Sequence, residues 1–105
     1  MDIDAMRKAA AQAGAMLRTL GNEDRLLLLC RLSQGEMAVS ELAQALDIRQ
    51  PTLSQQLGVL REEGLVSTRR AGKQIYYAVA DAKALALLHT LYQLYCPPPE
   101  NRDDH

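Results

Sequence analysis

Aromatic residues and cysteines are scarce in this sequence of 105 residues, which has no Trp, no Phe, four Tyr and two Cys. A core without large aromatic side chains has to be aliphatic, and the many Leu and Ala residues favour helices. The sequence also has no apolar run close to the roughly 20 residues of a membrane span, and its start is acidic where a signal peptide is basic. These absences predict a cytoplasmic protein, whose cysteines are buried thiols, metal ligands or redox-active groups rather than a permanent disulfide.

Apolar spacing and helix start signals predict five helices and one β-hairpin in a single domain that spans residues 1–105. The helices are expected at 4–20, 22–33, 40–47, 51–64 and 82–96, and the strands at 65–70 and 74–80, joined by 71–73. Asn22, Ser40 and Asp81 are suited to begin helices, and Pro51 fits a first helical turn. Residues 1–3 and 98–105 are expected to be flexible tails. The predicted fold class is mainly α with a β-hairpin.

The charge of this sequence is unevenly distributed, although the formal net charge is only −1. The segment 49–73 contains the basic residues Arg49, Arg61, Arg69, Arg70 and Lys73 and the acidic residues Glu62 and Glu63. This segment is therefore positive by three, and the rest of the chain is negative by four. One basic face on an otherwise acidic protein is what binding to nucleic acid requires.

Two short helices joined by a tight turn and followed by a hairpin are typical of a winged helix-turn-helix. In that motif the second helix enters the DNA major groove by its N-terminal end. The side chains offered there are Arg49, Gln50, Thr52, Ser54 and Gln55. Gln can pair with adenine, Thr and Ser can contact bases or phosphates, and Arg suits phosphate. The alternative is that they are ordinary capping and surface residues.

A resemblance to the ArsR/SmtB family of winged-helix bacterial repressors is carried by LRTLGNEDRLLLLCRLSQGEMAVSELAQAL and QPTLSQQLGVLREEGLVSTRRAGKQIYYAV. The string SQQLGVLREEGLV is highly specific, although many members have His where this sequence has Gln56. The resemblance implies a homodimer, held by the first and last helices, that represses by binding an imperfect palindrome in double-stranded DNA until an inducer loosens it. The wing residues Arg69, Arg70, Lys73 and Gln74 would lie along the DNA backbone or minor groove.

The resemblance does not extend to the metal sites of the family. Arsenic-type members have cysteines in the segment that corresponds to EMAVSEL, where this sequence has Ala38 and Ser40. Zinc-type members spread Asp, His and Glu ligands along the last helix, whereas here Asp81 is followed by Lys83 and a single histidine, His89. A transition-metal site needs three or four converging ligands. We therefore expect no metal and no other cofactor.

The two cysteines, in LLLLC and LYQLYC, resemble the sensing pair of the persulfide-sensing branch of the family, which includes BigR, SqrR and HlyU. By that resemblance Cys30 and Cys96 would be the redox-sensing residues. Reactive sulfur species would join them through a disulfide or a bridge with extra sulfur atoms, and the bridged form would release DNA. Arg25 or Arg31 could lower the pKa of Cys30. Free cysteine is also among the most buried residue types, so Cys30 could simply be a core residue.

Other classes of function were weighed on the same residues. An enzyme is not expected, because the sequence shows no nucleophile with an orienting base and no CxxC motif. A metal-responsive repressor of the same family with an unrecognised site remains an alternative, as does a constitutive DNA-binding regulator without a thiol switch. That regulator would differ from the sensor only in whether thiol chemistry changes its affinity for DNA.

Overall fold

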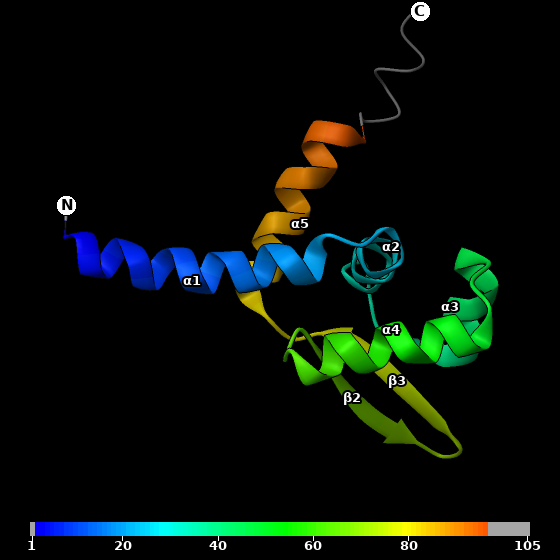
Figure 1. Ribbon diagram of the computed structural model, residues 1–105. Coiled ribbons are helices and arrows are strands. Elements are labelled where there is room, and N and C mark those ends of the chain that lie inside the picture. The colour runs from blue at the N-terminus through cyan, green and yellow to red at the C-terminus, as the bar shows by residue number, and fades with distance from the viewer. Residues whose placement is uncertain (1, 97–105) are drawn as a thin grey trace, which may run out of the picture.

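Five helices and three strands are formed by residues 2–96, the part of the chain that the computed structural model describes (Figure 1). The helices are α1 (Ile3–Leu20), α2 (Glu23–Leu32), α3 (Val39–Leu46), α4 (Gln50–Glu62) and α5 (Ala82–Tyr95), and the strands are β1 (Met37–Ala38), β2 (Val66–Ala71) and β3 (Gln74–Val79). The predicted order of four helices, a hairpin and a last helix is confirmed. The fold is a winged helix-turn-helix, mainly α.

Short polar side chains determine where three of the helices begin. The Oδ1 atoms of Asn22 and Asp81 accept hydrogen bonds from backbone N–H groups in the first turns of α2 and α5, at 3.1 and 2.9 Å, as predicted. Asp2 caps α1 in the same way, at 3.1 Å. Residues 2 and 3, which were expected in a flexible tail, are therefore the cap and the first residue of α1. The second expected tail, 98–105, lies outside the described residues.

The start of α3 differs in detail from the prediction, because a carboxylate and not a serine organises it. The helix begins at Val39 with Ala38 as its N-cap, and Glu41 Oε1 accepts a hydrogen bond from the Ala38 N–H at 2.9 Å. Ser40 lies exposed in the first turn instead of at the cap. The predicted role of Ser40 is therefore taken by the pair of Ala38 and Glu41.

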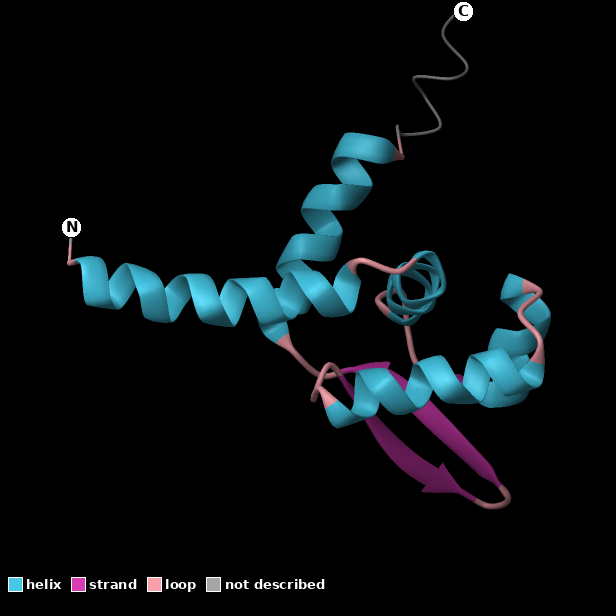
Figure 2. Cartoon of the chain, viewed as in Figure 1, coloured by secondary structure: helices cyan, strands magenta, loops and turns pink. Residues whose placement is uncertain are grey.

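The sheet has one strand more than the predicted hairpin. Met37 and Ala38 of β1 pair with Tyr77 and Tyr76 of β3, so the antiparallel order is β1-β3-β2. Figure 2 shows the hairpin of β2 and β3 below α4. Its two strands are joined at Gly72, where φ is 64°, a backbone conformation that favours glycine. The wing is thus attached to the segment that leads from α2 into α3.

The core is aliphatic, as the shortage of aromatic residues predicts. Its largest fully buried side chains are Leu28, Leu29, Leu42, Leu53, Leu57 and Leu60, from α2, α3 and α4. The helix α5 adds only Ala84 and Leu88, near its beginning. Within residues 2–96 no helix is both long and apolar enough to cross a membrane.

Helices α1 and α5, which we call the arms, project away from this core (Figure 1). They leave large apolar side chains exposed: Ile3, Met6 and Leu17 on α1, and Leu85, Leu87, Tyr92, Leu94 and Tyr95 on α5. Contiguous apolar surface of this kind marks an interaction site in a soluble protein. The core is therefore complete within one chain, whereas the arms are not covered.

Candidate nucleic-acid interface and cysteine pocket

The helix α4 buries one face and presents the other. Leu53, Leu57 and Leu60 pack into the core, while Ser54 and Gln55 are exposed on the opposite side and flank of the helix. Near the helix start, Arg49 and Gln50 are exposed and Thr52 is half-buried. Arg49 occupies the N-cap position, and the first turn carries no acidic residue. This end of the helix can therefore accept a phosphate group without charge repulsion.

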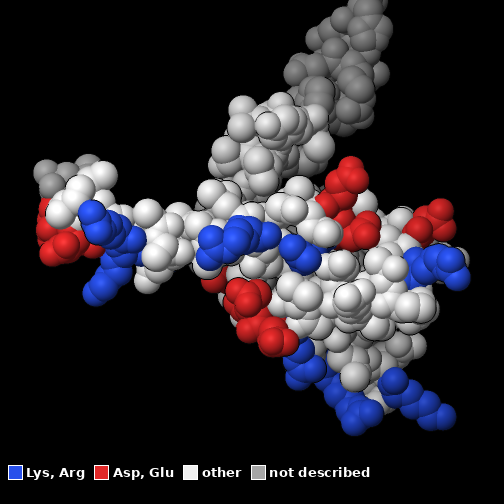
Figure 3. Space-filling view, viewed as in Figure 1, with Lys and Arg blue, Asp and Glu red and all other residues white. Residues whose placement is uncertain are grey.

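The hairpin carries the other part of the basic surface. Arg70, Lys73 and Gln74 are exposed, on or beside the turn that joins the two strands. Figure 3 shows Lys and Arg side chains gathered over the end of the hairpin, away from the acidic groups on this face. These three residues are positioned as a phosphate-binding wing requires.

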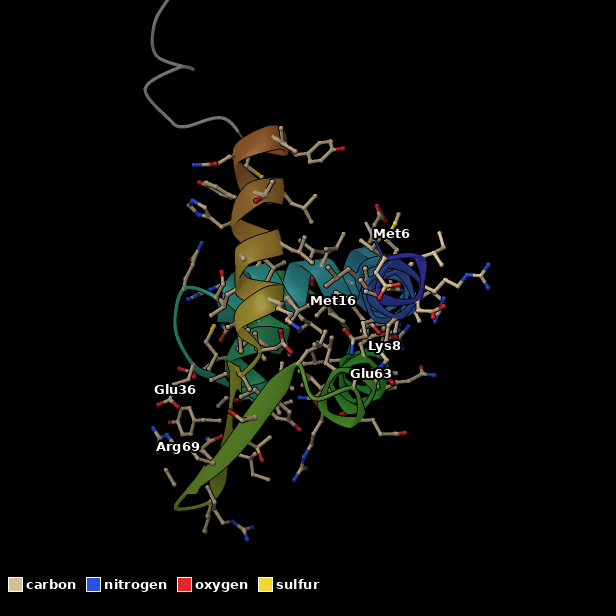
Figure 4. All side chains as sticks on the ribbon, turned by 90° about the vertical axis from the view of Figure 1, so that its left-hand side faces the viewer. Met6, Lys8, Met16, Glu36, Glu63 and Arg69 are labelled. Atoms are coloured by element: carbon tan, nitrogen blue, oxygen red, sulfur yellow. The ribbon has the colours of Figure 1, made fainter. Side chains whose placement is uncertain are left out.

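Arg69, the fourth predicted wing residue, is already engaged by a partner within the chain. Its Nε donates hydrogen bonds to both carboxylate oxygens of Glu36, at 2.8 and 3.0 Å, and its Nη2 forms an ion pair with the same group (Figure 4). The guanidinium also lies 4.8 Å from the centre of the Tyr76 ring. The hydrogen bond from Arg69 lowers the pKa of Glu36. Arg69 is thus not a free cation, and DNA would have to displace Glu36 to reach it.

Sequence reasoning missed Glu36 because the two partners are 33 residues apart. No local spacing rule connects them. The signal that could have found the pair is the strand β1, which follows Glu36 directly and places it beside the sheet.

The two cysteines, 66 positions apart in sequence, line one open pocket of about 740 Å³. Cys30 lies in the last turn of α2, and Cys96 is the C-cap of α5. Both are free thiols. The other lining residues are Leu27, Arg31, Ser33, Gln34, Leu46, Leu85, Leu88, His89 and Tyr92. The fold therefore brings together the residues that the resemblance paired.

The two thiols have different surroundings. Cys30 is half-buried, and burial raises its pKa, an effect to which the nearby Cys96 adds. Cys96 is exposed. The expectation that Arg25 or Arg31 lowers the pKa of Cys30 is wrong, because the net shift is upward and the guanidinium of Arg25 is bound to acceptors on α1 and α4. Of the two thiols, Cys96 is the accessible one.

The pocket also contains His89, but no metal centre is formed around it. Among residues 2–96, no three His, Cys, Asp or Glu side chains converge in a group that could hold a metal ion. Asp81, at the position where zinc-type members have a ligand, uses its carboxylate to cap α5. The expectation that the protein binds no metal stays a prediction.

Comparison with known proteins identifies the family. The family model described as "Bacterial regulatory protein, arsR family" matches residues 22–68. The chain is 54% identical over 99 residues to the biofilm growth-associated repressor of Agrobacterium fabrum, covering 94% of this chain and 85% of that protein. The crystal structure of the transcriptional repressor BigR from Xylella fastidiosa has 49% identity and a TM-score of 0.85, and it covers 93% of this chain and 100% of its own.

A second solved structure, reduced HlyU from Vibrio cholerae, has 37% identity and a TM-score of 0.86, and it covers 90% of this chain and 99% of its own. HlyU of Vibrio cholerae is named a transcriptional activator. All these relatives are regulators of transcription, and this chain is likewise a regulator and not an enzyme. It belongs to the ArsR family of bacterial regulatory proteins.

Proposed function

We propose that this protein is a DNA-binding transcriptional repressor that releases its operator when Cys30 and Cys96 become covalently bridged. The observation that carries the proposal is the single pocket lined by these two free thiols, which come from the packed helix α2 and the projecting helix α5. The basic surface of α4 and the hairpin is separate from this pocket. Thiol chemistry could therefore act on DNA binding through a change in helix arrangement, without touching the DNA-binding residues.

DNA binding is assigned to the start of α4 and to the hairpin. In this arrangement Gln50, Ser54 and Gln55 face base edges in the major groove, with Thr52 beside them, and Arg49 faces phosphate. Arg70, Lys73 and Gln74 contact the DNA backbone, joined by Arg69 once it leaves Glu36. Affinity supplied by these cations is expected to fall steeply with salt concentration.

The active form is proposed to be a homodimer held together by the two arms. Their exposed apolar residues need a cover, and a second copy supplies the same surface across a two-fold axis. Two α4 helices in such a dimer would read half-sites of an imperfect palindrome, about 34 to 36 Å apart. Replacing Leu94, which is 71% exposed on α5, by Asp should convert the dimer to a monomer in sedimentation. An unchanged mass would remove this interface.

The bridge is proposed to form in two thiol-exchange steps with a low-molecular-weight persulfide as the oxidant. The exposed Cys96 thiolate attacks the outer sulfur of the persulfide, which gives a persulfide on Cys96 and releases the small thiolate. The Cys30 thiolate then attacks the inner sulfur on Cys96, which forms the disulfide and releases hydrosulfide. Both cysteines lose their protons, and the sulfur donor is reduced. A bridge with extra sulfur atoms would require further donor molecules.

The bridge would act on the outer end of α5. This helix is anchored in the core by Ala84 and Leu88, near its beginning, so its far end is free to change position. A covalent link to Cys30 would fix that end against α2, which itself packs on α4. In the dimer, a new position of α5 relative to α2 changes the separation of the two recognition helices. A changed separation no longer matches the half-sites.

The test is a mobility shift on the DNA upstream of the protein's own gene, with reduced protein and with protein treated with polysulfide. Intact mass should show the loss of two hydrogen atoms, plus one sulfur mass for each atom inserted, in the form that has released DNA. Cys30→Ser and Cys96→Ser should bind DNA but no longer release it. If treated and reduced protein bind equally, the protein is a constitutive regulator with respect to sulfur donors. Treatment with peroxide in parallel identifies the class of oxidant.

A further inference from the structure

Arg25, in the first turn of α2, connects three helices through one guanidinium group. Its Nε donates a hydrogen bond to the carbonyl oxygen of Thr19 at 2.6 Å, and Nη2 donates a longer one to that of Arg18 at 3.4 Å. Its Nη1 donates to Gln56 Oε1 at 2.9 Å. The two carbonyls belong to the last turn of α1, and Gln56 lies in the middle of α4. Arg25 therefore joins an arm to the DNA-binding helix.

The packing between α1 and α4 leaves room for such a link. Each of the two helices packs mainly on α2. Between them is an open hollow of about 300 Å³, lined by Ala15, Arg18, Thr19, Arg25, Val59 and Glu63. Figure 4, which looks along α1, shows α4 beneath it, with Glu63 at its end. Apolar contacts alone thus do not fix the distance between the two helices.

A guanidinium is well suited to bridge this gap. The last carbonyls of α1 carry the partial negative charge of a helix C-terminus, and a permanently charged donor binds them favourably. The planar fork of Arg directs its donors to fixed positions, which the flexible ammonium of Lys cannot reproduce. The contacts with Thr19 and Gln56 are half-buried, so they are screened by solvent less than an exposed pair such as Arg69 and Glu36.

We propose that Arg25 is a positioning residue that fixes α4 relative to α1 through the Gln56 side chain. In a dimer formed by the arms, this link determines the separation of the two recognition helices. The inference rests on the proposed function, since it requires that dimer. Arg25 itself has no contact with DNA in this arrangement, because its donors are directed into the protein.

The test measures the distance between the two α4 helices directly, without DNA. A spin label is attached through Ser54→Cys in a background of Cys30→Ser and Cys96→Ser, and the label-to-label distance distribution is recorded by pulsed electron paramagnetic resonance. Arg25→Gln should shift or broaden the distribution relative to the parent. Gln56→Leu, which removes only the acceptor, should do the same. Gln56→Glu keeps an acceptor and should preserve the narrow distribution.

Arg31→Gln is the matched control, because it removes a guanidinium from the same helix without touching Thr19 or Gln56, and it should leave the distribution unchanged. If Arg25→Gln does not fold, Gln56→Leu and Arg25→Lys carry the test. An unchanged distribution in Gln56→Leu and in the folded Arg25 variant would overturn the role of Arg25 alone. If the parent gives no dipolar signal, there is no dimer, and the proposed function and this inference are both wrong.

Discussion

The packed centre of the molecule and its two arms treat the same residue types in opposite ways. Leu28, Leu53 and Leu57 in the centre are at most 1% exposed, whereas Leu94 and Tyr95 on α5 are 71% and 76% exposed. The centre, with α4 and the hairpin, is a finished structure that can present DNA-binding side chains. The arms bury little of their apolar surface against it. The difference teaches that the fold of one chain accounts for the recognition surface but not for the assembly that would use it.

The largest expected effect separates these two regions by stability. Leu57→Ala should lower the free energy of unfolding by about 2–5 kcal/mol, because it opens a cavity in a closely packed core. Leu94→Ala should cost far less at low protein concentration, where the arms are uncovered, and more at high concentration, where a dimer forms. Urea denaturation at two protein concentrations measures both. Equal losses in the two variants would contradict the division into a complete centre and incomplete arms.

A second test compares the thiol of the centre with the thiol at the end of an arm. At neutral pH, Cys30 in the Cys96→Ser variant should be alkylated more slowly than Cys96 in the Cys30→Ser variant, because Cys30 is half-buried with a raised pKa. A raised pKa leaves little thiolate, and below that pKa each unit of pH should increase the Cys30 rate about tenfold. Iodoacetamide kinetics followed by mass spectrometry give both rates. Faster alkylation of Cys30 would exchange the attacking and resolving roles.

A smaller effect distinguishes two neighbouring arginines of the wing. Arg70→Ala should weaken DNA binding across sequences and reduce the salt slope by about 0.9, as expected for one lost phosphate contact. Arg69→Ala should cost less, because Arg69 gives up Glu36 before it binds phosphate and its removal also leaves Glu36 unpaired. Titrations of a promoter fragment at several salt concentrations measure both. If both variants lose the same affinity and slope, the Glu36 pair does not restrain Arg69.

The smallest effect concerns Gly58, an exposed glycine inside α4. A Cβ added there meets no atom within 4 Å, so Gly58→Ala should stabilise the protein by about 0.5–1 kcal/mol through helix propensity. The thermal unfolding midpoint should rise accordingly. If this more stable variant also binds DNA less tightly, the outward face of α4 approaches DNA closely at Gly58. A lower midpoint would contradict the placement of this residue on a free helix face.

The helices and the hairpin could be predicted because their signals are local. Asn22 and Asp81 cap helices at the positions where they occur in the sequence, Pro51 lies in the first turn of α4, and Gly72 makes the hairpin turn. Each of these signals acts within about four residues of the element that it starts or ends.

The parts that could not be predicted depend on distant partners. Two residues, Met37 and Ala38, are too short a run to read as a strand, and they become one only because β3 offers an edge. Arg25 and Gln56 meet across 31 positions of the sequence. The pairing of the two cysteines came from a resemblance, and only the fold places them in one pocket. Single-sequence patterns contain no term for such encounters.

The order of the sheet has a consequence for solubility. Strand β3 is covered on both sides, whereas β2 has a neighbour on one side only and is an edge strand. An edge strand offers unpaired backbone groups to which a strand of another molecule can add, and charged side chains discourage such addition. Arg69 and Arg70 lie next to each other on this strand. The cations assigned to phosphate contact therefore also protect the wing from aggregation, so variants that neutralise both are expected to precipitate more readily.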